Sequence, residues 1–178
     1  FVVGWTVQLR ESATVARELI AQALEQQQIA PDQLTVHADR GSPMRSKPVA
    51  FLLADLGVTK THSRPYTSDD NPFSEAHFKT LKYRPDFPDR FGSQEHARSF
   101  VRAFMTWYNH EHRHSGIGLL PPAVVHTGQA AQWYAERERV LLAAHAAMPQ
   151  RFINGLPHPP ALPTAVWINP PKPQEAAH

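Results

Sequence analysis

An apolar run that alternates with polar residues leads directly to an acid in Leu34-Thr35-Val36-His37-Ala38-Asp39-Arg40-Gly41. Such alternation is typical of a short strand, and the Asp and Gly that follow are typical of a turn. We therefore predict a short buried strand over Leu34 to His37, with Asp39 held at its carboxyl end.

A second acid lies farther along the chain in Asn71-Pro72-Phe73-Ser74-Glu75-Ala76-His77-Phe78-Lys79-Thr80-Leu81-Lys82. Proline is favoured at the first position of a helix, so Pro72 predicts a helix that begins here. Glu75 then falls in the first turn or just past it, where the positive end of the helix dipole favours a carboxylate. Lys79 and Lys82 follow at i+4 and i+7, on the same helical face.

Asp39 and Glu75 together are typical of a divalent metal site. Mg²⁺ takes hard oxygen ligands, keeps several waters and lets a substrate phosphate complete its coordination shell. Two such ions can hold the attacking and leaving oxygens of an in-line phosphoryl displacement. Lys79 and Lys82 beside the acid suit a phosphate backbone. Two simpler interpretations stay open: Glu75 and Lys79 could form an ordinary surface i,i+4 ion pair, and Asp39 could belong to a plain turn.

The flanking segments predict an alternation of strands and helices, which is typical of an α/β domain. From Pro149 onward, eight of the 17 prolines fall in the last 30 residues, so we expect an extended tail there. The predicted elements, in chain order, are a strand over 1–7, a helix capped by Ser12, a helix from Ser46 to Gly57, a strand over 58–62, a loop over 63–70, a long helix opened by Ser93, a short helix at Pro121 and Pro122, and a helix over 129–147.

The composition allows one core plus an appendage, because the chain has 178 residues and is 42% hydrophobic. It contains no cysteine, which excludes disulfides and thiolate metal sites and indicates a reducing compartment. A net charge of +2 is too small to argue for nucleic acid by itself. Between His37 and Arg84, however, eight basic residues stand against five acids, so positive charge gathers around the two proposed ligands. Arg40 and Arg64 belong to this group and are candidate phosphate contacts, with a solvated surface role as the alternative.

Two other groups of side chains have a candidate function. His110, His112 and His114 alternate with charged residues, a pattern that can bind a transition metal, but nothing else in the chain supports zinc. Trp107 and Tyr108 could stack on bases. Their place on the apolar stripe of the long helix favours core packing instead.

Three segments resemble the integrase catalytic core of bacterial insertion-sequence transposases: HADRG (37–41), SRPYTSDDNPFSEAHFKTLK (63–82) and WYNHEHRHSGIGLLPPA (107–123). These transposases belong with retroviral integrases to the DDE superfamily. The resemblance implies that Asp39 and Glu75 are the second and third acids of the Asp, Asp, Glu triad. Lys79 and Lys82 look like the lysines that approach the DNA ends. It also implies Mg²⁺ or Mn²⁺ as the cofactor, strand cleavage by water, and strand transfer by a DNA 3′-hydroxyl.

The fold implied by this resemblance is α/β and ribonuclease H-like, with a central mixed sheet flanked by helices. We expect residues 1–127 to form an integrase catalytic core that is truncated at its N-terminus and lacks its first strand. Residues 128–148 would form a C-terminal helix, and residues 149–178 a Pro-rich tail. In the family the first acid lies on the first strand, upstream of the segment that matches Phe1 to Trp5. We therefore expect this chain alone to be catalytically inactive or nearly so.

The partners implied are DNA, as element ends and as target, and further copies of the protein when it is active. The implied location is the bacterial cytoplasm, in association with the nucleoid and not with a membrane. The alternative function is a non-catalytic remnant that binds DNA or oligomerises with an intact transposase.

Overall fold

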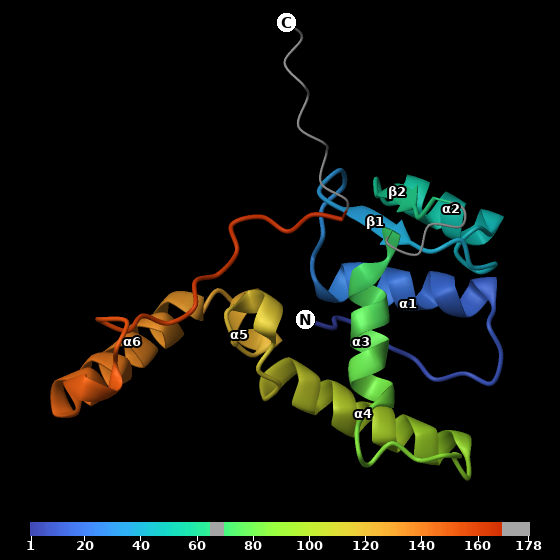
Figure 1. Cartoon of the computed structure of the whole chain (residues 1–178). Helices are drawn as coiled ribbons and strands as arrows, with labels where there is room; N and C mark the ends of the chain where they lie inside the picture. Colours follow the sequence, from blue (N-terminus) through green and yellow to red (C-terminus); the bar gives the residue numbers. More distant parts are fainter. Residues whose placement is uncertain (65–69, 169–178) are drawn as a thin grey trace, which may run out of the picture. The chain divides into compact units, whose positions relative to one another are not determined.

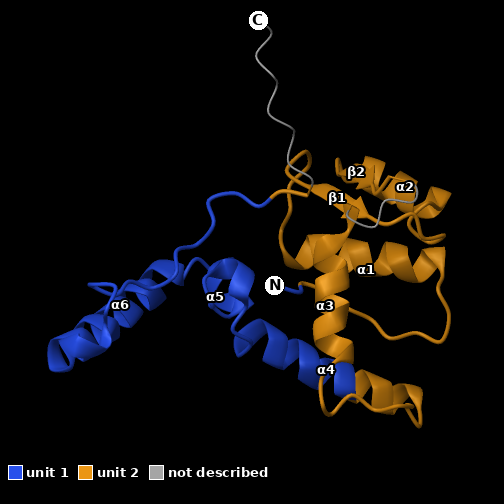
Figure 2. Cartoon of the chain, viewed as in Figure 1, with its two compact units in different colours: residues 1–2, 100–166 blue, residues 3–99, 167–178 orange. Residues whose placement is uncertain are grey.

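The structure, a computed structural model, describes residues 1–64 and 70–168. The chain divides into two compact units (Figure 2). Unit 1 consists of Phe1–Val2 and Phe100–Val166, and unit 2 consists of Val3–Ser99 with the residues from Trp167 on. The boundary falls inside one long helix, α4 (Gln94–His110), so each unit is described by itself.

Unit 2 contains a parallel pair of strands joined through a helix, which confirms the predicted α/β class (Figure 1). Strand β1 (Thr35–Ala38) pairs with β2 (Thr59–His62), and α2 (Lys47–Asp55) lies between them in the chain. Within the described residues these two strands are the whole sheet, where a larger mixed sheet was expected. Strand β1 begins one residue later than predicted. It alternates between exposed and half-buried positions, so the prediction of a buried strand is wrong.

The core of unit 2 is small and is built by helices against one strand. Helix α1 (Ala13–Gln26) begins at Ser12, whose side chain accepts a hydrogen bond from the Val15 N–H, as the sequence predicts. Leu24 of α1 packs with Val49 and Leu53 of α2 and with Val58 just before β2; further partly buried apolar side chains surround them (Ala16, Ile20, Ile29, Val36 and Met44).

Residues 1–7 form no strand, so that prediction is also wrong. A strand exists only where a neighbouring backbone accepts and donates its hydrogen bonds. Here side chains take that place. The Asn109 side-chain amide bonds both the N–H and the carbonyl of Val2, at 2.9 and 3.0 Å. Gln94 donates to the carbonyl of Val7 at 2.9 Å.

The remaining helices follow the predicted pattern. Helix α3 (Pro72–Lys82) follows Asn71, and α4 follows Ser93, whose hydroxyl accepts the His96 N–H at 3.0 Å. Unit 1 continues with η2 (Ser115–Ile117), α5 (Pro122–His126), α6 (Ala130–Ala147) and η3 (Pro149–Arg151).

The core of unit 1 joins the second half of α4 to the start of α5. Phe104 and Tyr108 are buried on α4, and Leu120, Pro121 and Val124 are buried at the start of the next segment. This burial favours core packing of the α4 aromatic stripe. Among residues 1–64 and 70–168, no helix is both long and apolar enough to span a lipid bilayer.

Candidate metal and nucleic-acid site

Asp39 lies directly after β1, at the carboxyl end of the parallel pair. Its side chain is exposed, and one carboxylate oxygen accepts the Gly41 N–H at 2.9 Å. Its backbone carbonyl accepts a hydrogen bond from the Nδ1 of His62, at the end of β2, also at 2.9 Å. The turn therefore fixes the carboxylate at the edge where open α/β sheets bind ligands.

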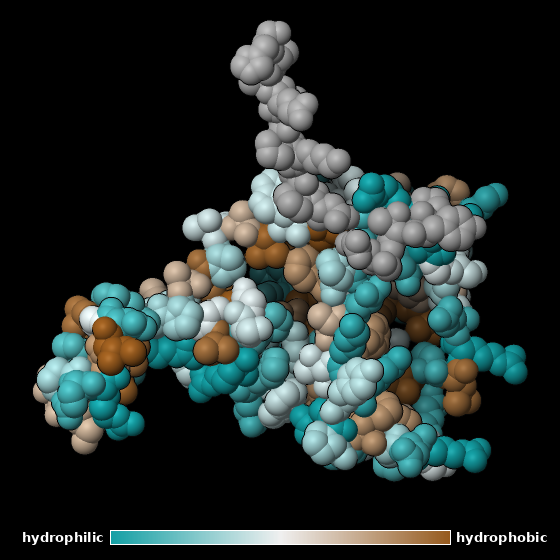
Figure 3. Space-filling view, in the orientation of Figure 1, coloured by the Kyte–Doolittle hydropathy of each residue, from teal (hydrophilic) through white to brown (hydrophobic). Residues whose placement is uncertain are grey.

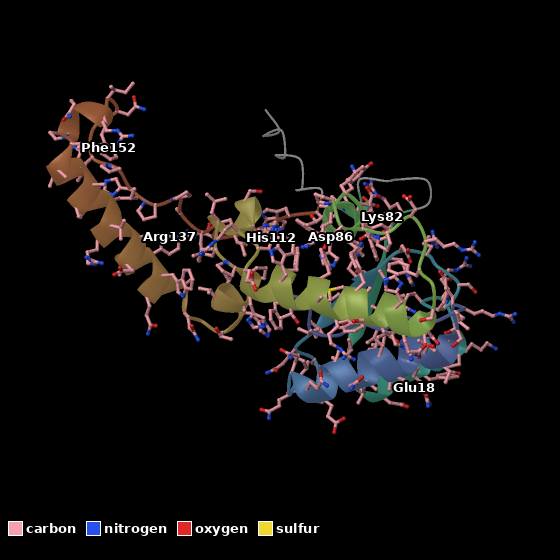
Figure 4. The ribbon with its side chains drawn as sticks, turned by 90° about the horizontal axis from the view of Figure 1, so that it is seen from below. Glu18, Lys82, Asp86, His112, Arg137 and Phe152 are labelled. Carbon is pink, nitrogen blue, oxygen red and sulfur yellow. The ribbon has the colours of Figure 1, made fainter. Side chains whose placement is uncertain are left out.

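Glu75 lies in the first turn of α3 and is exposed, as predicted. Lys79 and Lys82 lie in the last turns of the same helix, and Lys82 is labelled in Figure 4. In the part of the chain that the structure describes, Glu75 forms no ion pair with Lys79 or with any other cation. The simpler interpretation of an ordinary i,i+4 pair is therefore not realised here. An acid and two lysines are left facing solvent.

A histidine ties the strand that leads to Asp39 to the start of the helix that carries Glu75. His37, on β1, makes one hydrogen bond through Nε2 to the carbonyl oxygen of Asp70 and another through Nδ1 to the hydroxyl of Thr61, both at 2.9 Å. A carbonyl only accepts, so Nε2 carries the proton, and in the neutral ring Nδ1 accepts from Thr61. Asp70 stands just before α3. His37 thus holds two segments together whose acids are distant in sequence.

Asp70 is itself buried and is satisfied by Arg64. Its carboxylate accepts the backbone N–H of Arg64 at 2.7 Å and two guanidinium N–H groups at 2.9 Å each. The bond to Asp70 raises the pKa of the Arg64 guanidinium above its ordinary value. Arg64 was predicted to contact DNA. Its side chain is 67% exposed, so donors remain for a phosphate, although part of the guanidinium is engaged by Asp70.

Arg40 is exposed beside Asp39 and lines a shallow pocket with Ser42, Arg45 and Ser46. This pocket lies at the start of α2, where Ser46 donates its hydroxyl to the Pro43 carbonyl at 2.6 Å and does not cap the helix with its side chain. The Arg40 side chain is thus accessible to a phosphate, as the predicted contact requires.

The two candidate ligands are of the type that binds a hard divalent cation, but two are fewer than such a site normally has. Asp39 and Glu75 offer carboxylate oxygens, which Mg²⁺ and Mn²⁺ prefer. Within residues 1–64 and 70–168, however, no cluster of three or more acidic, histidine or cysteine side chains could hold a metal. An ion held by two carboxylates depends on water and on substrate oxygens for the rest of its shell.

Two of the three alternating histidines, His112 and His114, make contacts inside unit 1. The His112 ring, labelled in Figure 4, stacks on Tyr108 with ring centroids 5.2 Å apart, and His114 lies 5.9 Å from His112. The His114 Nδ1 accepts the N–H of Gly116. Burial first, and the charge of His114 second, lower the pKa of His112 below 6.5. Burial also raises the pKa of the Tyr108 hydroxyl.

The sequence interpretation missed the positioning roles of His37 and Asp70. Both residues lie inside the segments that carry the resemblance, at 37–41 and 63–82. The available signal was a polar side chain on a strand next to a proposed ligand, but its partner could be found only in three dimensions.

Comparison with known proteins gives a family match over part of the chain and a similar fold. Residues 56–122 match the family described as integrase core domain. The crystal structure of the catalytic core domain of BIV integrase is similar, with a TM-score of 0.52 and 22% identity over 72% of this chain and 80% of that chain. A chain of the simian T-cell lymphotropic virus intasome, solved with PP2A regulatory subunit B56 gamma, matches with a TM-score of 0.42 and 15% identity over 58% and 36%. No curated protein matches the chain.

The family match includes α3 with Glu75, Lys79 and Lys82, whereas Asp39 lies before it. The fold likeness covers most of the chain. Residues 56–122 are thus similar to an integrase core domain, and the fold is similar to that of a retroviral integrase catalytic core.

Proposed function

We propose that this chain is the core of a transposase that processes DNA by metal-dependent phosphoryl transfer, with Asp39 and Glu75 as ligands of Mg²⁺ or Mn²⁺. The observation that supports it most is the tie between β1 and the start of α3 through His37 and Asp70. It joins a strand that is followed directly by one exposed acid to a helix that carries another in its first turn.

The charges around the acids support DNA as the substrate. Lys79 and Lys82 are exposed on α3, and Arg40 is exposed beside Asp39. Basic side chains that surround a carboxylate site bring phosphates to the ion and compensate their charge. Arg64 would add a phosphate contact through the donors that Asp70 does not occupy.

Each side chain has a defined task when an ion is bound. The turn at Gly41 orients the Asp39 carboxylate, and the first turn of α3 stabilises the charge of Glu75 through the helix dipole. A bound divalent ion would stabilise negative charge on a phosphoryl group. With two carboxylates only, we expect weak binding of the ion and no efficient cleavage by this chain alone.

Metal-dependent DNA binding tests the proposal. Fluorescence anisotropy with a labelled duplex would be measured with Mn²⁺ and again with EDTA, so that the difference isolates the ion. We expect Mn²⁺ to raise the affinity in the wild-type chain and to do so far less in Asp39→Asn and Glu75→Gln. Asp55→Asn, an exposed acid at the end of α2, is the matched control and should respond like the wild type.

An equal Mn²⁺ response in all four proteins would refute the metal site. A supercoiled-plasmid nicking assay with Mn²⁺ tests the expected lack of cleavage. Robust nicking that disappears in Asp39→Ala would show that two carboxylates suffice.

The second candidate is a non-catalytic remnant that binds DNA or oligomerises with an intact transposase. It is favoured by the lack of a third ligand among the described residues. DNA binding without any response to Mn²⁺ would support this function over the first. For either function we propose residues 1–127 as the core, 128–148 as a C-terminal helix and 149–178 as a tail, in a bacterial cytoplasmic protein associated with the nucleoid.

A further inference from the structure

A proline-rich segment of unit 1, after η3, has no regular secondary structure. Residues 157–163 read Pro-His-Pro-Pro-Ala-Leu-Pro and form neither helix, strand nor turn. Proline fixes its own φ at about −65° and keeps the preceding residue out of the helical region, so this sequence favours an extended, polyproline-like backbone. Such a backbone makes no hydrogen bonds to itself, and its carbonyl oxygens stay free to accept from elsewhere. We name residues 157–163 the strap.

The chain after α6 runs back along that helix in the opposite direction. Near the end of α6, where Phe152 is labelled in Figure 4, the Phe152 and His145 ring centroids lie 5.4 Å apart. Farther along the chain, the His158 Nδ1 lies 3.3 Å from a carboxylate oxygen of Glu138. The later residue thus contacts the earlier turn of the helix, which brings the strap onto the first half of α6.

The half-buried side chains of α6 define the face that this segment covers. Hydrophobic and hydrophilic side chains are interspersed over the surface of α6 (Figure 3). Half-buried positions nonetheless recur at the spacing of one helical face. Two of them are aromatic, and proline-rich segments are recognised by grooves lined with aromatic side chains. The half-buried residues are Ala130, Trp133, Tyr134, Arg137, Leu141 and His145.

Tyr134 and Gly118 fit the backbone of the strap. The Tyr134 hydroxyl donates a hydrogen bond to the Pro160 carbonyl at 2.5 Å. Gly118 has a φ of +65°, and a Cβ there would collide with the Tyr134 hydroxyl and lie 2.8 Å from the Pro160 carbonyl oxygen. Only glycine therefore allows both groups to come this close.

Two arginines hold the walls around the strap. Arg137 donates to the carbonyl oxygens of Gly118, at 2.8 Å, and Leu119. The Arg113 guanidinium lies 5.0 Å from the centroid of the Trp133 ring. Both cations are engaged by their own chain, so this face offers aromatic surface and a hydroxyl donor to a ligand.

The strap leaves part of this face uncovered. A cavity of about 780 Å³ remains between Pro160 and the α6 side chains of Trp133 and Leu141. In the part of the chain that the structure describes, the polar contacts between the strap and α6 are those of Pro160 and His158. Incomplete packing forfeits van der Waals contacts, so the strap is held weakly.

We propose that this face of α6, together with the turn at Gly118, is a binding site for proline-rich segments, and that the strap occupies it from within the same chain. A proline-rich segment added from outside must displace the strap, which competes at the high effective concentration of a tethered ligand. The site lies in unit 1, whereas the proposed metal ligands lie in unit 2, so failure of one proposal leaves the other standing.

A labelled peptide with the sequence of residues 156–164 tests the site by fluorescence anisotropy. It is titrated against the wild-type chain and against Pro159→Gly with Pro160→Gly, whose glycines loosen the strap. We expect this loosened variant to bind the peptide roughly tenfold or more tightly than the wild type, because its own strap competes less. A peptide that carries the same two glycines is the control and should bind neither protein measurably.

The hydroxyl of Tyr134 makes the binding test specific. In the loosened variant, Tyr134→Phe should weaken peptide binding by roughly two- to tenfold, the effect of one neutral hydrogen bond. Tyr83→Phe, at an exposed tyrosine of unit 2, is the matched control and should leave the affinity unchanged. Circular dichroism would verify that the variants keep their helices. Equal binding by wild type and loosened variant, no binding by either, or full affinity after Tyr134→Phe would each overturn the site.

Nuclear magnetic resonance relaxation of the full chain tests the strap in place. We expect the backbone order parameters of Ala161 and Leu162 to fall below about 0.6 in Gly118→Ala, because the added methyl group displaces the strap. Gly128→Ala is the matched control, since Gly128 has a φ of +72° and no atom within 4 Å of its would-be Cβ. Values already below about 0.6 in the wild type, or an equal fall in both variants, would show that the strap does not occupy the site.

Discussion

The His37 ring donates its Nε2–H to the carbonyl oxygen of Asp70 at 2.9 Å. The two residues are 33 positions apart, and each stands a few residues before one of the proposed metal ligands. The bond therefore ties the segment that leads to Asp39 to the segment that leads into α3. Positioning of this kind matters because a metal site tolerates little displacement of its ligands.

Replacement of His37 by alanine should destabilise unit 2. The variant loses the bonds to Asp70 and Thr61, each worth about 0.5–1.5 kcal/mol net, so we expect a loss of about 1–3 kcal/mol. Urea unfolding monitored by circular dichroism measures it. His110→Ala, at the exposed end of α4, should change stability by less than about 0.5 kcal/mol. Equal losses in both variants would contradict a positioning role.

Replacement of Asn109 by alanine should release the first residues of the chain. Asn109 is buried and satisfies both backbone polar groups of Val2, which become unpaired in the variant. We expect a loss of about 1–3 kcal/mol and faster amide hydrogen exchange at Val2. Asn154→Ala, in the exposed loop after η3, is the matched control. Unchanged exchange at Val2 would mean that the side chain does not hold this segment.

Stability should fall as the solution becomes more acidic, in part through His112. The pKa of His112 is lowered in the folded state by burial and by the charge of His114. As the pH falls, the imidazole is therefore protonated near pH 6.5 in the unfolded chain but only at lower pH in the folded chain. The unfolded state then binds more protons, and stability declines as pH falls through 6.5 toward the lowered pKa. Between pH 7.5 and 5.5, the urea midpoint of unfolding should fall less steeply with decreasing pH in His112→Gln than in the wild type. Parallel slopes in the two proteins would exclude His112 as a source.

The lysines of α3 should govern the salt dependence of DNA binding. If Lys79 and Lys82 each contact a phosphate, removal of both should reduce the slope of log affinity against log salt by about 1.8 for duplex DNA. Arg10→Ala with Arg17→Ala removes the same charge from exposed positions at and before α1 and is the matched control. Titrations at several NaCl concentrations measure the slopes. A similar reduction in both double variants would indicate a diffuse charge effect without defined contacts.

Local sequence signals predicted the helices well. Ser12, Ser93 and Pro72 mark helix starts that the structure shows, because capping and proline geometry act within a few residues. Gly57 follows α2 with a φ of +63°, the left-handed conformation that suits the end of a helix. The placement of Asp39 after a strand and of Glu75 in a first turn was likewise readable from neighbouring residues.

β1 and β2 were predicted to within a residue or two, but the strand expected over residues 1–7 was not formed. The segment from Phe1 to Val7 has the composition of a strand but lies beside amide side chains from Asn109 and Gln94, which pair with its backbone instead. Whether β-forming residues become a strand depends on which backbone lies next to them.

By itself, the sequence determined where the helices begin, that the chain alternates strand and helix, and which two acids and lysines are candidates for metal and DNA. Tertiary structure alone decided that His37 reaches Asp70, that Arg64 is engaged by Asp70, and that α6 buries none of its side chains. The physical reason is the sequence separation over which each kind of interaction acts. Caps, turns and helix dipoles are satisfied within a few residues of the chain, whereas hydrogen bonds and cavities between distant segments exist only once the chain has folded.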